Sequence, residues 1–118
     1  MITEMGKQMR MLRIERDEKL LDMAGKLGMS PSFLSAVEKG HKAPPAGMEE
    51  NVIAAYGLNW TEAAKLRSAA DRSRHAFTIK PETELGRDTV GMLARRMNDI
   101  PDVDLAAIQS ILNKSEKK

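Results

Sequence analysis

The sequence predicts an all-α protein, with a helical domain over residues 1–73 and a helical extension over residues 74–118. Two observations predict this class. Apolar residues recur three and four positions apart along most of the chain, which is the spacing of one buried helix face. Glycine, proline and capping residues interrupt that spacing at short intervals and divide it into separate helices. Residues 75–79 differ, because they are rich in β formers and are expected to be either a short strand or an extended linker.

The first helix is expected over residues 3–16, and Asp17 and Glu18 are expected to open the second, since acidic groups are favourable near a helix N-terminus. The second helix should end at Gly28, because glycine readily takes the left-handed conformation that terminates a helix. The residues expected to face the core are Met5, Met9, Leu12 and Arg13 in the first helix and Leu20, Met23, Ala24 and Leu27 in the second.

A third helix follows after a three-residue turn. Ser30 offers a hydroxyl cap, and Pro31 fits the first helical position, where its missing N–H is no loss. This helix should bury Leu34 and Val37 with help from Phe33, and it should end at Gly40. Its outer face then carries small, polar or cationic side chains: Ser32, Ser35, Ala36 and Lys39. A helix with such a face can closely approach the base edges in the major groove of DNA.

The two prolines of residues 43–45 predict an extended link, because proline disfavours helix in the residue before it. A fourth helix is expected over residues 48–56, and an asparagine-x-x-glutamate capping box starts a fifth that runs to about Arg72. Two more helices are expected in the extension, one over residues 84–97 and one capped by Asp102. The expected core residues are Val52, Ile53 and Tyr56 in the fourth helix and Trp60, Ala63, Ala64 and Leu66 in the fifth.

The segments GKQMRMLRIERD and LLDMAGKLGMSPSFLSAVEKGHKAPP resemble the helix-turn-helix of phage-type repressors, the Cro and lambda-repressor-like or XRE family. The framework of Ala24, Gly28, Leu34, Glu38 and Gly40 falls at that family's spacing. The resemblance covers roughly the first 60 residues and implies a lambda-repressor-like five-helix DNA-binding domain. It also implies an ion pair between Arg13 and Glu38. The later segment HAFTIKPETELGRDTVGMLARRM looks like the extension of a subgroup of short regulators.

These patterns and the resemblance predict a sequence-specific regulator of transcription that binds double-stranded DNA and acts as a repressor at its own or a neighbouring promoter. Pro31, Ser32, Ser35 and Ala36 are expected to face the bases, and Ser30, Lys39, His41 and Lys42 to face phosphates. The net charge of +2 is only a weak argument for a nucleic-acid partner, since residues 1–58 carry 8 Lys or Arg against 8 Asp or Glu and are not basic as a whole. Leu20 is a departure, because the family often has a phosphate-contacting glutamine there.

The last two helices carry apolar stripes that they cannot bury alone. We expect a homodimer on an inverted-repeat operator, formed through Phe77, Ile79, Leu93, Met97, Ile108 and Leu112. A monomer whose two last helices fold back on its own core is the alternative architecture. Two other functions stay open: an antitoxin that autoregulates and holds a toxin through its C-terminal helices, and a protein-interaction module with a degenerate helix-turn-helix.

Catalysis is not expected. The two histidines, His41 and His75, show no metal-ligand spacing, and Glu49 and Glu50 are adjacent, so they point to different sides of a helix. The chain has no cysteine, which excludes a disulfide framework and a thiolate zinc site. We therefore expect no metal, no cofactor, no membrane segment and a cytoplasmic location.

Overall fold

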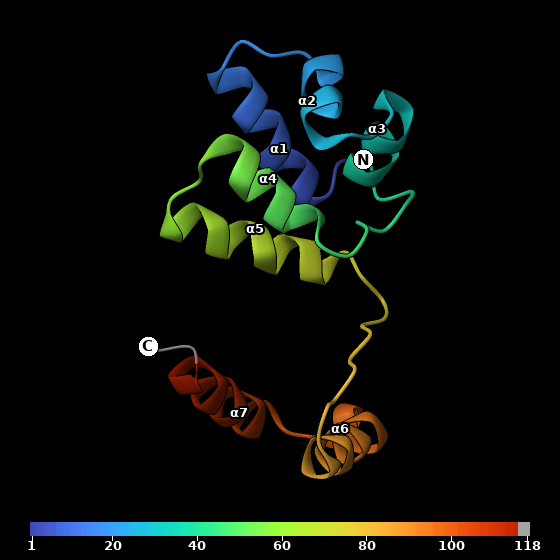
Figure 1. The fold of residues 1–118 in the computed structure, drawn as a ribbon, viewed down its shortest axis with the longest axis vertical. Helices are drawn as coiled ribbons and strands as arrows, with labels where there is room; N and C mark the ends of the chain where they lie inside the picture. The colour runs from blue at the N-terminus through green and yellow to red at the C-terminus, as the bar shows by residue number, and fades with distance from the viewer. Residues whose placement is uncertain (116–118) are drawn as a thin grey trace. The chain divides into compact units, whose positions relative to one another are not determined.

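The structure, a computed structural model, describes residues 1–115 and is all-helical over that range, which confirms the predicted class. It divides into two compact units, Met1–Phe77 and a second that begins at Thr78, here called the N-terminal and C-terminal units. Figure 1 labels the α-helices. The N-terminal unit holds α1 (Glu4–Glu15), α2 (Leu20–Leu27), α3 (Pro31–Glu38), α4 (Met48–Tyr56) and α5 (Trp60–Arg72), and the C-terminal unit holds α6 (Glu84–Arg96), the 3-10 helix η1 (Met97–Asp99) and α7 (Asp102–Ser115).

Residues 75–79 form no strand, so the first of the two expectations for this segment is wrong. A strand needs a neighbour to complete its backbone hydrogen bonds. No strand occurs within residues 1–115, so this segment has none to pair with. The segment is therefore an extended linker, which was the second of the two expectations.

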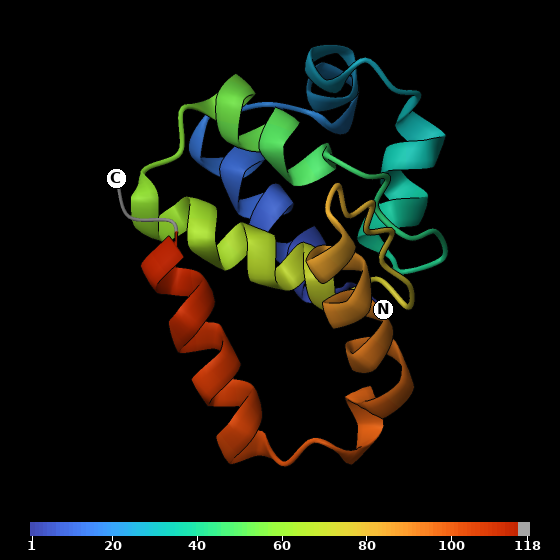
Figure 2. The same cartoon turned by 60° about the horizontal axis from the view of Figure 1, so that its bottom comes forward.

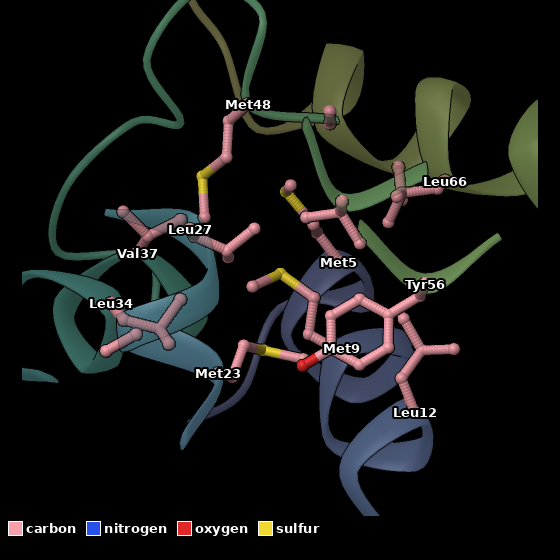
Figure 3. Close-up of a cluster of buried hydrophobic side chains, with 14 residues drawn as sticks. Met5, Met9, Leu12, Met23, Leu27, Leu34, Val37, Met48, Tyr56 and Leu66 are labelled. Atoms are coloured by element: carbon pink, nitrogen blue, oxygen red, sulfur yellow. The ribbon is translucent and has the colours of Figure 1, made fainter. Parts of the chain in front are cut away.

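Methionine fills much of the core of the N-terminal unit. Figure 3 shows Met5, Met9, Met23 and Met48 meeting in its centre, from α1, α2 and α4. All four are buried, and an unbranched thioether adapts to the irregular space that short helices leave between them. Around them lie the other large buried side chains: Leu12, Leu27, Leu34, Val37, Val52, Tyr56 and Leu66.

Three core or boundary expectations are wrong. Trp60 is 86% exposed and Ala64 is also exposed, because the buried face of α5 runs through Ala63, Leu66 and Ala70 instead. Asp17 and Glu18 do not open α2, which begins at Leu20. Asp17 lies in the preceding loop with a positive φ of 57°, and the carboxylate that accepts from the Lys19 N–H at the start of α2 belongs to Asp22.

Helix α1 approaches the C-terminal end of α3 very closely at Gly6. The Thr3 N–H and hydroxyl both donate to the Glu38 carbonyl, at 2.9 and 3.1 Å. The same hydroxyl accepts from the Gly6 N–H at 3.0 Å and so caps α1. A Cβ atom at Gly6 would lie 2.4 Å from the Glu38 carbonyl oxygen, so this position requires glycine.

We therefore expect Gly6→Ala to lower the free energy of unfolding by about 1–3 kcal/mol, because α1 and α3 must move apart. Gly25→Ala in α2 is the matched control, since nothing lies within 4 Å of a Cβ there. That variant should be neutral or slightly stabilising, because alanine is the better helix former. Urea unfolding followed by circular dichroism measures both, and equal midpoints for the two variants would contradict the close approach.

The C-terminal unit has no buried residue among residues 78–114. Figure 2 shows α6 and α7 leaving their connecting turn as separate arms. Between them lies a groove of about 410 Å³, lined by apolar side chains that include Met92, Leu93, Ile100 and Ile108. The large apolar residues left exposed in this unit are Ile79, Leu85, Met92, Met97, Val103, Ile111 and Leu112. None of the described helices has the length and apolar character that crossing a membrane would need.

Candidate nucleic-acid interface

The turn between α2 and α3 is built as the sequence predicts. Gly28 is left-handed, with φ 67°, and the next N–H, that of Met29, donates to the Ala24 carbonyl at 3.0 Å. The Ser30 hydroxyl oxygen accepts from the Phe33 N–H at 3.1 Å, and Pro31 is the first residue of α3. These local contacts stop one helix and start the next within three residues, which fixes the two helices as a rigid pair.

Helix α3 buries one face and presents another to solvent. Leu34 and Val37 are buried in the core. Of the residues expected to face the bases, Ser32 is exposed and the other three, Pro31, Ser35 and Ala36, are half-buried. The outer surface of α3 therefore carries small and mostly polar side chains, and none of them is bulky enough to keep a ligand away from the helix backbone.

The cationic residues expected at phosphates lie at the C-terminal end of α3. Lys39, His41 and Lys42 are exposed, as is Ser30 at the opposite end of the helix. The loop backbone folds back on the helix, since the N–H groups of His41 and Lys42 both donate to the Ala36 carbonyl, at 2.8 and 3.3 Å. These contacts hold the backbone of His41 and Lys42 against the C-terminal end of α3.

The expected ion pair between Arg13 and Glu38 is present and anchors α3 to α1. Arg13 donates from Nη1 and Nη2 to the two carboxylate oxygens, at 2.5 and 3.1 Å, and both residues are buried. Together with the Thr3 contacts to the Glu38 carbonyl, the pair fixes the last residue of α3 through its side chain and its backbone. The orientation of the exposed face of α3 is therefore set from α1.

Glu18, whose negative charge would repel a nucleic-acid backbone, is neutralised within the unit. Its carboxylate accepts from the Tyr56 hydroxyl at 2.6 Å and pairs with Lys26. The hydrogen bonds from Lys26 and Tyr56 hold the pKa of Glu18 below its usual value. Burial and the same carboxylate raise the pKa of Tyr56, whose ring also lies under the Lys26 ammonium.

Two further carboxylates, at the start of α4, form ion pairs with arginines, and no sequence pattern predicted these pairs. Arg67 donates to Glu50 at 2.7 and 2.9 Å, and Arg74 donates to Glu49 at 2.7 and 3.0 Å. Hydrogen bonds from Arg74 lower the pKa of Glu49, so its carboxylate stays ionised and compensated. Glu49 and Arg74 are 25 positions apart, and no local spacing rule connects them.

The arrangement offers a surface for binding. Within residues 1–115 no three His, Cys, Asp or Glu side chains gather as a set of metal ligands. The residues expected at bases and phosphates, by contrast, lie together along α3 and the loop that follows it. Comparison of the chain with family models, with curated proteins and with solved structures found no match.

Proposed function

We propose that this chain is a sequence-specific, double-stranded-DNA-binding regulator of transcription, with the lambda-repressor-like architecture of the XRE family. The observation that carries the proposal is the exposed small-residue face of α3 with Lys39, His41 and Lys42 beside it. Within the described part of the chain neither lysine pairs with a carboxylate, so both remain available to phosphates. We further propose that it acts in the cytoplasm as a repressor at its own or a neighbouring promoter.

The base-facing side chains of α3 define a simple readout. Serine hydroxyls at positions 32 and 35 donate or accept, and the methyl group of Ala36 suits a thymine methyl. No arginine or glutamine on α3 supplies a bidentate base contact. We therefore expect sequence choice to depend partly on DNA shape and deformability.

The paired carboxylates weaken the alternative of an interaction module that has lost DNA binding. That alternative rested on the zero net charge of residues 1–58, on Asp17 and Glu18, and on Leu20. Glu18 is compensated by Lys26. Glu50 is compensated by Arg67 of α5, and Glu49 by Arg74, which lies two residues beyond the end of α5. Leu20 packs against the core, so it has a structural role that needs no phosphate.

The test is a gel-shift titration against the protein's own upstream DNA at several salt concentrations. Lys39→Gln and Lys42→Gln should each weaken binding to all sequences alike and lower the salt slope by about one unit. Ser35→Ala should instead change discrimination at one or two base pairs. Lys65→Gln, an exposed lysine of α5, is the matched control. A Lys39→Gln or Lys42→Gln variant with unchanged affinity and slope on every DNA would refute the assignment.

We also propose that the C-terminal unit pairs with a second copy of itself. Its apolar residues are exposed, and each of its helices is acidic at the start and basic at the end, with Glu84 against Arg95 and Arg96 in α6 and Asp102 and Asp104 against Lys114 in α7. In a two-fold antiparallel pair the opposite ends of equivalent helices meet, so unlike charges come together. Such a dimer would place two copies of α3 on an inverted repeat, roughly 34–36 Å apart.

In the antitoxin alternative, the exposed apolar residues of α6 and α7 bind a different protein. A toxin would cover α6 and α7 in place of the second copy, while the N-terminal unit still bound DNA. Sedimentation of the chain alone separates the two, because the homodimer forms without any other protein.

A further inference from the structure

Arg74 lies two residues beyond the end of α5, and its side chain reaches the loop between α3 and α4. Its Nε donates to the Pro44 carbonyl at 3.1 Å, and its Nη2 donates to the Pro45 carbonyl at 2.7 Å. The same guanidinium forms two hydrogen bonds with the Glu49 carboxylate, and only 12% of the side chain is exposed. One arginine therefore binds the loop backbone and the first turn of α4 at once.

The loop needs such a tie because it contains no helix or strand between residues 39 and 47. Its α3 end is held where the N–H groups of His41 and Lys42 meet the Ala36 carbonyl, and its α4 end where the Met48 N–H meets the Pro45 carbonyl. Pro44 and Pro45 have no N–H to donate, so their segment cannot complete a backbone ladder. Arg74 binds the two carbonyls of this middle part.

We propose that Arg74 is a positioning residue for the loop that carries His41 and Lys42, and so for the phosphate contacts of the interface. This inference rests on the proposed DNA-binding function. A guanidinium suits the role because its planar fork donates in several fixed directions, whereas a lysine ammonium is a point charge on a flexible stem.

The experiment uses the full chain with Arg74→Ala and Arg74→Lys. Arg67→Ala is the matched control, because Arg67 also joins α5 to a glutamate of α4 while Glu50, its partner, lies outside the loop. The first readout is amide hydrogen exchange of the free protein. We expect both Arg74 variants to speed exchange at His41 and Lys42 at least tenfold while amides in the middle of α1 keep their rates, and we expect Arg67→Ala to leave the loop rates unchanged.

The second readout is the salt dependence of DNA binding, measured well below the melting temperature of each variant. Loss of a positioned loop should lower the salt slope of DNA binding by about one to two units, although Lys39 and Lys42 are both unaltered. A purely stabilising role would lower the melting temperature and leave the slope of the folded protein unchanged. Arg74→Lys keeps the positive charge, so a parent-like slope and parent-like loop exchange in that variant would overturn the inference.

The two readouts separate this inference from the proposed function. If the parent chain fails to bind DNA, the proposed function is wrong, and hydrogen exchange still tests the tie between Arg74 and the loop. If the parent binds DNA but exchange at His41 and Lys42 is unchanged in Arg74→Ala, the positioning role is wrong. Exchange that rises equally in the loop and in the middle of α1 also overturns it.

Discussion

Glu38→Ala should lower the free energy of unfolding of the N-terminal unit by about 3–5 kcal/mol, because it leaves the Arg13 guanidinium buried without its counter-ion. Glu38 is only 2% exposed, and Arg13 is nearly as well buried, so water cannot replace the lost carboxylate. A loss of that size corresponds to a fall in melting temperature of more than about 10 °C for a domain of this length. Thermal unfolding followed by circular dichroism measures it.

The matched control is Glu50→Ala, which breaks the ion pair of Glu50 with Arg67 at the surface. The side chains of that pair are about half exposed, and such pairs contribute about 0–1 kcal/mol. Replacing both buried partners, in Arg13→Met/Glu38→Leu, should recover much of the loss, since no unpaired charge then remains. If Glu38→Ala melts within a degree or two of the parent, the pair contributes little and the argument from burial is wrong.

The starts and stops of the helices could be predicted because their causes are local. A left-handed glycine at position 28, the Ser30 cap and the Asn59–Glu62 capping box each act within a few residues, and the structure contains all three. Pro31 at the first helical position belongs to the same group. Rules that connect neighbours in sequence therefore gave the end of α2 and both boundaries of α3 and α5 to within a residue or two, but they misplaced the start of α2.

Burial was harder to predict where a helix offers two apolar faces. Helix α5 has alanines on several sides, so the sequence alone did not distinguish the face of Ala63 and Leu66 from the one that includes Ala64. Trp60 was assigned to the core together with these residues, but it is the first residue of α5 and is exposed. Packing against other helices decides which face of a helix is buried, and the sequence pattern of one helix alone does not contain that information.

Apart from the Arg13–Glu38 ion pair, which the family resemblance implied, the parts of the candidate interface that depend on distant contacts could not be predicted. The requirement for glycine at position 6 arises from the Glu38 carbonyl, which lies on another helix. The tie from Arg74 to Pro44, Pro45 and Glu49 joins segments 25 to 30 positions apart. Residues 30–42, by contrast, were assigned from their order along α3 and its loop, because a helix face follows directly from spacing.

If the proposed dimer forms on DNA, Met97→Asp and Leu112→Asp should each convert it into a monomer and reduce affinity for an inverted-repeat operator by about 10²–10⁴-fold, since the linkage between two DNA-binding units is lost. In one copy of the chain Met97 is 46% exposed and Leu112 is 59% exposed. A charge at either position should therefore disturb a single copy by no more than about 0.5 kcal/mol. The same charge would be desolvated if a second copy covered it.

Sedimentation and DNA binding together check this expectation. The parent chain should sediment at about twice its mass of 13.1 kDa at micromolar concentration, and the two variants at that mass. A DNA with one half-site should bind parent and variants nearly equally, because the N-terminal unit is unaltered. Ala106→Asp is the control, since it adds the same charge to α7 on the side away from Ile108 and Leu112. A parent chain that sediments as a single species near 13.1 kDa would refute the dimer, and the apolar faces of α6 and α7 would then have to be covered by the chain's own core or by a different protein.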